Sequence, residues 1–146
     1  MKRLFLLSLL LMMSIAASLA AVYTDGNGVT WTYNVEGDNI TIIGAEGCGE
    51  DVTVPGTIDG KTVTKLYETF SGNTTIKHVA VPTSVTSVDW GTFKNCIRLV
   101  RVEGLSNCVG IDGSAFFGCS NLKSVDLAEC TQIGGTAFDH CSILSM

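Results

Sequence analysis

Apolar side chains return along this chain at a nearly constant interval. The clearest series is Phe70, Phe93, Phe116 and Phe138, with spacings of 23, 23 and 22 residues. Four further series keep the same register: Asn73, Cys96, Cys119 and Cys141; Ile76, Leu99, Leu122 and Leu144; Val79, Val102 and Val125; and Val88, Ile111 and Ile133. Five series in one register indicate an internal repeat rather than chance.

Each repeat contains two short extended stretches. One is residues 122–127, with apolar residues at its first, fourth and sixth places, and the other is residues 85–88 or 108–111. They are too short for helices, and their β-branched residues favour strands. Because a unit of this size cannot bury its own apolar face, stacked coils must bury a shared one. We therefore predict a repeat solenoid in which each series forms a column, meaning the residues at one place in successive coils.

Two segments resemble the BspA-like leucine-rich repeats of bacterial surface proteins. They are residues 115–122 (Ala-Phe-Phe-Gly-Cys-Ser-Asn-Leu) and residues 81–88 (Val-Pro-Thr-Ser-Val-Thr-Ser-Val), and the resemblance extends over residues 51–146. It implies a right-handed leucine-rich-repeat coil of short parallel strands, turns and short 3-10 segments, in a protein that adheres to or contacts extracellular proteins. Three departures stand out: Asn73 replaces cysteine, Gly104 and Leu105 interrupt a strand, and Pro82 has no later counterpart.

The region before the repeats has a different pattern. Residues 29–35 and 39–42 alternate between apolar and polar, and Glu36-Gly37-Asp38 separates them, which predicts a β-hairpin that covers one end of the solenoid. Residues 52–55 match residues 79–82 with four extra residues in the interval, which fit a turn at residues 58–62. We expect a hairpin cap at residues 21–50 and about four units over 51–146, the last one incomplete.

The first twenty residues read as a signal peptide. Lys2 and Arg3 precede an apolar run at residues 4–15, and small residues at Ser18 and Ala20 predict cleavage after Ala20. The alternative is an uncleaved anchor. The charge argues against a nucleic-acid role: the formal net charge is −5, and a negative chain lacks the basic footprint of a nucleic-acid binder. We expect a secreted or cell-surface protein that does not insert into a membrane after cleavage.

Six cysteines in an exported chain raise the question of disulfides. Cys96, Cys119 and Cys141 share a column with Asn73, which predicts a small inward side chain that donates a hydrogen bond to loop carbonyls. Cys108 and Cys130 share a column with Val85, which predicts small hydrophobic roles. Three alternatives remain at this point: buried free thiols, one or more disulfides, or a metal site. The chain has no Cys-x-x-Cys pair, which zinc sites usually need.

The candidate binding surface is the outward face of the first strand in each coil. Its residues form a partly basic pair of columns beside an acidic one: Lys77 and His78; Val100, Arg101 and Glu103; Lys123, Ser124 and Asp126. The alternative interpretation is a solvated sheet face whose charge pairs contribute little. Tyr67 and Trp90 mark a second face that the pattern also leaves exposed.

No residue constellation predicts catalysis or a bound cofactor. Asp139, His140 and Cys141 are sequence neighbours, whereas a catalytic triad needs spatial convergence. We therefore expect a binding module that contacts an extracellular protein or surface macromolecule, and not an enzyme. The alternative is a structural spacer or truncated fragment of a larger surface repeat protein. The last unit stops at Met146 where its strand should begin, and such an open end invites self-association.

Overall fold

The structure, a computed structural model, describes residues 19–142. Most of the predicted leader and the last residues, including Leu144 and the predicted open end, lie outside this range. The strands are β1 (Ala21–Thr24), β2 (Thr30–Glu36), β3 (Asn39–Glu46), β4 (Asp51–Thr53), β5 (Thr57–Ile58), β6 (Lys61–Leu66), β7 (His78–Ala80), β8 (Ser87–Val88), β9 (Arg101–Glu103), β10 (Gly110–Ile111), β11 (Ser124–Val125) and β12 (Gln132–Ile133). One 3-10 turn, η1 (Leu105–Asn107), accompanies them.

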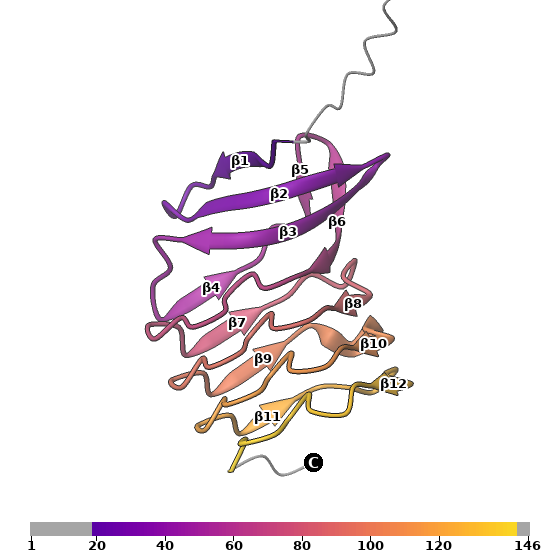
Figure 1. Ribbon diagram of the computed structural model, residues 1–146. Helices are drawn as coiled ribbons and strands as arrows, with labels where there is room; N and C mark the ends of the chain where they lie inside the picture. Colours follow the sequence, from indigo (N-terminus) through magenta and orange to yellow (C-terminus); the bar gives the residue numbers. More distant parts are fainter. Residues whose placement is uncertain (1–18, 143–146) are drawn as a thin grey trace, which may run out of the picture.

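Two sheets run along the stack of coils (Figure 1). The long sheet has eight strands in the order β1-β2-β3-β6-β8-β10-β12, with β5 paired to β6. The short sheet has four strands in the order β11-β9-β7-β4, all parallel. Each coil contributes one strand to each sheet, which confirms the predicted β-solenoid of short parallel strands.

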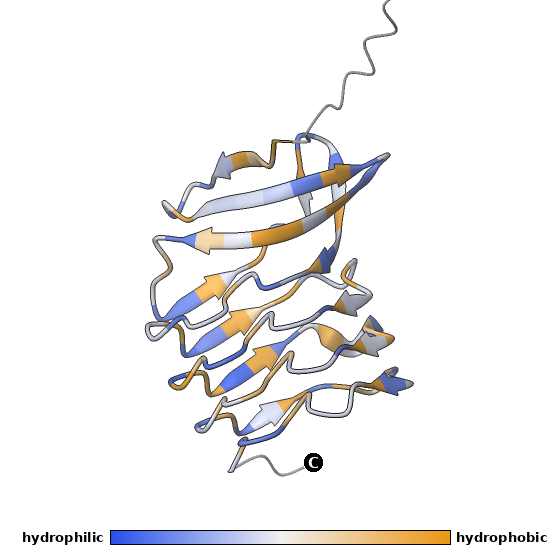
Figure 2. Ribbon diagram, viewed as in Figure 1, coloured by the Kyte–Doolittle hydropathy of each residue, from blue (hydrophilic) through white to orange (hydrophobic). Residues whose placement is uncertain are grey.

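The register of the short sheet follows the repeat. Val52 pairs with Val79, Val79 with Val102, and Val102 with Val125. Val52, Val79 and Val102 point into the core, and their strand neighbours are exposed because successive side chains of a strand point to opposite faces. Figure 2 shows the same alternation as an apolar band between hydrophilic strand positions.

The phenylalanine column forms a continuous stack through the interior. Ring centroids lie 5.3 Å apart between Phe70 and Phe93, 4.9 Å between Phe93 and Phe116, and 5.0 Å between Phe116 and Phe138, with interplanar angles of 14°, 15° and 7°. The first three rings are buried and Phe138 is partly buried. The predicted aromatic series is therefore the packed centre of the repeats.

The N-terminal hairpin is built from β2 and β3, which pair antiparallel, and β1 pairs antiparallel with β2. It is continuous with the repeats, because β3 pairs in parallel with β6 and its buried residues belong to the same hydrophobic core. Tyr33 of β2 donates its hydroxyl to Asp59, at the turn between β5 and β6, at 2.9 Å. That this hairpin acts as a cap stays a prediction.

Gly104 directly follows β9, which is as long as β7, so the predicted interruption of this strand is wrong. Its φ is 86°, and a Cβ at this position would lie 1.8 Å from the carbonyl oxygen of Val81 in the preceding coil. Only glycine fits a left-handed conformation with the backbone so close. The chain then forms the 3-10 turn that begins at the buried Leu105.

Candidate binding surface

Outward side chains of the short sheet form two parallel columns. The first contains Asp51, His78, Arg101 and Ser124, which the register aligns in neighbouring strands. The second contains Thr53, Ala80 and Glu103 in aligned strand positions, followed by Asp126 just after β11. All of these residues are exposed. Arg101 thus lies between His78 and Ser124 in its column.

Ion pairs link much of this surface internally. Arg101 Nη2 lies 2.8 Å from Glu103 Oε1 on the same strand, and His78 Nδ1 lies 2.7 Å from Asp51 Oδ1 on the neighbouring strand. The two basic groups therefore have carboxylates beside them before any partner arrives. Because all four side chains are well exposed, each pair contributes little to stability.

The residues that precede β7, β9 and β11 bond to one another through the backbone. Lys77, Val100 and Lys123 continue a backbone hydrogen-bond ladder, with Val100 N donating to Lys77 O and Lys123 N donating to Val100 O. Lys77 and Val100 are only partly exposed. Lys123, at the equivalent place in the next coil, is exposed, so the predicted outward place of these three residues stays a prediction.

Glu50 forms ion pairs with two basic residues at the edge of the short sheet. Its Oε1 lies 2.8 Å from Lys77 Nζ and 3.2 Å from Arg98 Nη2. The hydrogen bond from Lys77 and the charges of Lys77 and Arg98 hold the pKa of this carboxyl below its ordinary value, against a smaller opposing effect of desolvation. Lys77 and Arg98 are consequently engaged within the molecule.

Two shallow hollows lie along the short sheet. One is lined by residues between Arg101 and Gly104 together with Ser106 and residues 124–126. The other is lined by Asn27 of the N-terminal region, by β4 and β7, and by Glu103. Glu103 lines both hollows, so it stands at the centre of the candidate surface beside Arg101.

The cysteine column donates hydrogen bonds from coil to coil. Cys96 Sγ donates to Phe70 O at 3.0 Å, Cys119 Sγ to Phe93 O at 3.0 Å and Cys141 Sγ to Phe116 O at 3.1 Å. All six cysteines are free thiols. Desolvation raises the pKa of Cys96 to about 12 and raises that of Cys119 further. The thiols of Cys96, Cys119 and Cys141 thus each donate to a carbonyl of the preceding coil, and their raised pKa values keep them protonated at neutral pH.

Asn73 does not share this role, although it shares the column. Its Oδ1 accepts hydrogen bonds from the backbone N–H groups of Thr75 at 2.8 Å and Ile76 at 2.9 Å, and the residue is half-buried. The prediction of an inward, inaccessible donor was wrong here. The Asn73 side chain accepts hydrogen bonds within its own turn, so it does not make the inward hydrogen bond that the cysteines of this column make.

Residues 19–142 offer neither a metal site nor a membrane-spanning helix. No group of three or more histidine, cysteine or acidic side chains within this range is placed to hold a metal ion. No helix within the same range is long and apolar enough to cross a membrane.

Parallel coils of 22 or 23 residues around stacked phenylalanines define a leucine-rich-repeat solenoid. The chain belongs to the family with the BspA type leucine rich repeat region, whose model matches residues 57–146 and describes six copies. This membership confirms the resemblance inferred from residues 81–88 and 115–122. It supports a repeat module for protein interaction.

Solved structures share the architecture. A leucine rich cell surface protein from Faecalibacterium prausnitzii is 26% identical with a TM-score of 0.75; the match covers 86% of this chain and 35% of that one. A leucine-rich repeat protein from Bacteroides ovatus is 25% identical with a TM-score of 0.67, covering 76% of this chain and 32% of that one. A T. pallidum leucine rich repeat protein, at 23% identity and a TM-score of 0.63, shows the fold alone, with coverage of 88% and 68%. The comparison with curated proteins gave no significant match.

Proposed function

We propose that this chain is an extracellular, surface-displayed binding module whose short sheet contacts another protein. It acts by binding and not by catalysis. Its family and the cell-surface description of the Faecalibacterium prausnitzii neighbour support this setting. That chain is longer, since the match spans about a third of it, so adhesion by a whole surface protein is part of the proposal.

One observation carries the proposal. The inward positions of the short sheet hold the same residue type in every coil, whereas the outward positions hold different residues. The inward column holds a valine in all four coils. The outward column changes from Asp51 to His78, Arg101 and Ser124. A regular scaffold that presents a different side chain in each coil can distinguish one partner from another. A face with the same side chain in every coil could recognise only a repeated feature.

The charges define what such a partner must present. Because Arg101 and Glu103 pair with each other, a partner that binds over them must offer both an acidic and a basic group or leave the pair intact. An acidic partner surface alone would meet Glu103 and the exposed Asp126 of the neighbouring column. The proposed partner surface is therefore of mixed charge.

A charge swap tests the proposal while it keeps the internal pair. In the double variant Arg101→Glu with Glu103→Arg, the two side chains still pair, so the melting temperature should change little. Proteins captured by the full chain from extracellular material should be identified, and their affinities measured with the wild type and the swap. We expect the swap to weaken binding by about tenfold or more, which corresponds to about 1.4 kcal/mol.

Glu129→Arg serves as the matched control, because Glu129 is exposed and lies outside the short sheet. It should bind like the wild type. If no captured protein distinguishes the swap from the wild type, the short sheet is a solvated face. The chain would then be a spacer in a larger surface protein, or it would bind elsewhere.

A further inference from the structure

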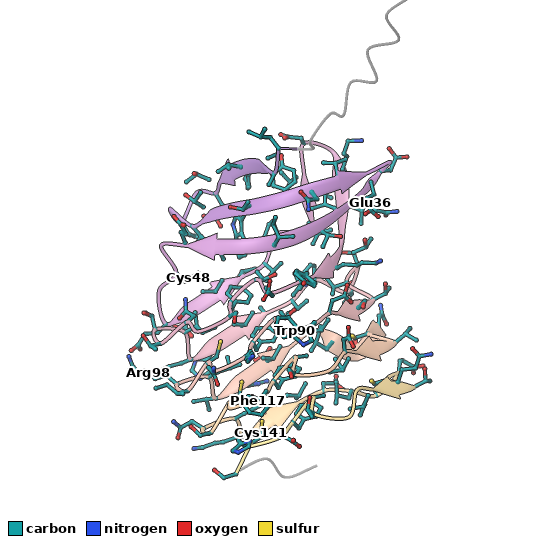
Figure 3. All side chains as sticks on the ribbon, in the orientation of Figure 1. Glu36, Cys48, Trp90, Arg98, Phe117 and Cys141 are labelled. Atoms are coloured by element: carbon teal, nitrogen blue, oxygen red, sulfur yellow. The ribbon has the colours of Figure 1, made fainter. Side chains whose placement is uncertain are left out.

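A second surface alternates aromatic rings with basic side chains. Lys94 Nζ lies 5.0 Å from the ring centroid of Trp90 and 5.9 Å from that of Phe117, and the rings of Phe117 and His140 have centroids 4.8 Å apart. These four residues, here called the aromatic strip, come from three successive coils. Trp90, Lys94 and Phe117 lie on connections from the long sheet to the short sheet, and His140 follows β12; Figure 3 labels Trp90 and Phe117.

Lys94 differs from most other basic groups of the described chain. Residues 19–142 contain seven lysines and arginines, and four of them, Lys61, Lys77, Arg98 and Arg101, have a carboxylate within 4.0 Å. Lys94 has none among these residues; two aromatic rings hold it instead. A cation against ring faces keeps its charge available while the rings restrict its motion.

This restriction lowers the cost of binding an anion. A free lysine side chain loses rotamer entropy when it is fixed in a complex, and Lys94 has already lost part of it against Trp90 and Phe117. Beside the ammonium group, Trp90 is 40% exposed and offers apolar area to a partner. Exposed tryptophan is enriched among the residues that dominate protein interfaces.

From these contacts we infer that the aromatic strip is a second interaction surface and that it fits an acidic segment of a partner protein. A carboxylate of the partner pairs with Lys94, and an adjacent apolar side chain packs on the exposed part of Trp90. Lys94 lies against the ring faces that would attract a cation, so the strip favours an acidic group over a basic one, although the exposed Glu68 carboxylate lies nearby. This surface does not depend on the short sheet, so it stands or falls separately from the proposed function.

Tryptophan fluorescence gives a direct readout. The chain contains two tryptophans, and Trp31 is fully buried, so a change caused by a ligand at the surface reports on Trp90. The full chain should be titrated with a soluble peptide in which leucines are separated by aspartates. Matched peptides carry asparagine or lysine in place of aspartate, and polygalacturonate serves as an anionic glycan.

We expect the aspartate peptide to change Trp90 fluorescence with saturation, and the asparagine and lysine peptides to bind much more weakly. Lys94→Met should reduce affinity for the aspartate peptide by about tenfold or more, and Lys94→Arg should restore most of it. Binding should weaken as salt is raised. Lys123→Met is the control, because Lys123 is exposed, has no carboxylate within 4.0 Å among the described residues and is not in the strip.

Three results would overturn the inference. Equal loss in Lys123→Met and Lys94→Met would mean that the peptide responds only to overall charge. Binding of polygalacturonate through Lys94 without binding of the peptide would make the ligand an acidic glycan instead. No saturable change with any probe, in a chain whose circular dichroism and melting temperature are normal, would mean that the strip is only surface. The charge-neutral swap of Arg101 and Glu103 should leave peptide binding unchanged, which separates this surface from the short sheet.

Discussion

The indole ring of Trp31 meets the phenyl ring of Phe70 edge-on, with centroids 6.0 Å apart and planes at 86°. Every later ring pair along the phenylalanine column is stacked instead. The contact joins the N-terminal hairpin to the first ring of the repeats, since both rings are buried in one core. An edge-to-face pair of this kind is a favourable aromatic geometry. The column therefore ends against Trp31 and not against solvent.

Loss of a ring from the middle of the column should be costly. Phe116 is fully buried and stacks with a ring on each side. Phe116→Ala should lower the free energy of unfolding by about 3–5 kcal/mol, as measured by urea denaturation. Phe138→Ala should cost less, because Phe138 is only partly buried. A cost below about 1 kcal/mol for Phe116→Ala would show that the ring does not pack inside.

Gly104 should not tolerate a side chain. Gly104→Ala combines a left-handed backbone with a Cβ that would lie 1.8 Å from Val81 O, so it should destabilise the chain by about 2 kcal/mol or more. Gly110→Ala is the control, since the nearest atom to its added Cβ is Gln132 Oε1 at 4.0 Å. Thermal melting of the two variants measures the difference. Equal melting temperatures would contradict the close approach of the two coils.

The thiols should be slow to react in the folded chain. Cys96, Cys108 and Cys119 are buried, and desolvation raises the pKa of each, so little reactive thiolate forms at neutral pH. A thiol reagent should modify these three rapidly only after denaturation. Reducing agent should barely change the melting temperature. A large drop on reduction would show that disulfides hold the stack, contrary to the free thiols of the structure.

The same thiols predict a loss of stability at alkaline pH. The folded-state pKa of Cys96 is about 12, above the ordinary value of 9.0. A raised pKa contributes stability that is fully present below the unfolded value and is lost as pH rises through the folded value. The free energy of unfolding should therefore fall as pH increases above about 9. Cys96→Ala, compared with wild type in the same buffers, should show a shallower fall.

Asp25 should make the N-terminal region sensitive to acid. Desolvation acts to raise its pKa, but hydrogen bonds from the Trp31 indole N–H at 2.9 Å and from backbone N–H groups outweigh it and hold the pKa below its ordinary value of 3.8. This lowered pKa contributes stability above the unfolded value that is lost as pH falls through the folded one. Asp25→Asn should cost about 1 kcal/mol near neutral pH and flatten the acid dependence below about pH 4.

Urea denaturation of Asp25→Asn at several pH values, followed by the fluorescence of buried Trp31, measures this effect. Thr24→Ala is a suitable control, because Thr24 bonds only to the exposed Thr30 hydroxyl among the side-chain contacts. If Asp25→Asn and wild type lose stability in parallel as the pH falls, the carboxylate does not anchor Trp31.

If residues 1–20 are a signal peptide, the mature chain should begin at Ala21. Cleavage after Ala20 would place the new amino terminus at the first residue of β1. N-terminal sequencing of the secreted protein should read Ala-Val-Tyr-Thr. Detection of a product that keeps residues 1–20 would instead support the uncleaved anchor.

Much of the fold could be predicted because the same residue type recurs at the same position of successive coils. The column of Val79, Val102 and Val125 predicted the parallel register that the short sheet has. The extra residues before Val79 predicted a turn, and β5 and β6 form a hairpin there. The departure at Gly104 is visible in the sequence, but the need for glycine there is not, because the carbonyl of Val81 approaches it from another coil.

The surfaces were less predictable. Strand alternation correctly placed Arg101 and Glu103 outward, but the pattern could not show that they pair with each other or that Lys77 pairs with Glu50. The pattern predicts exposed aromatic residues at Tyr67 and Trp90, whereas the position of Lys94 between Trp90 and Phe117 has no sequence signal. Those residues come from different coils, and long side chains reach neighbours in directions that spacing alone does not define.

The period, the inward columns and the family can be read from the residues alone, because burial repeats at a fixed interval and tolerates few residue types there. Which polar side chains meet depends on how the coils stack. Asn73 shows the difference: its column predicted an inward donor, but its side chain closes its own turn and accepts two backbone hydrogen bonds. A buried apolar side chain has one favourable environment, the core. A polar side chain can hydrogen-bond to several different partners, and the stacking of the coils fixes which of them lies within reach.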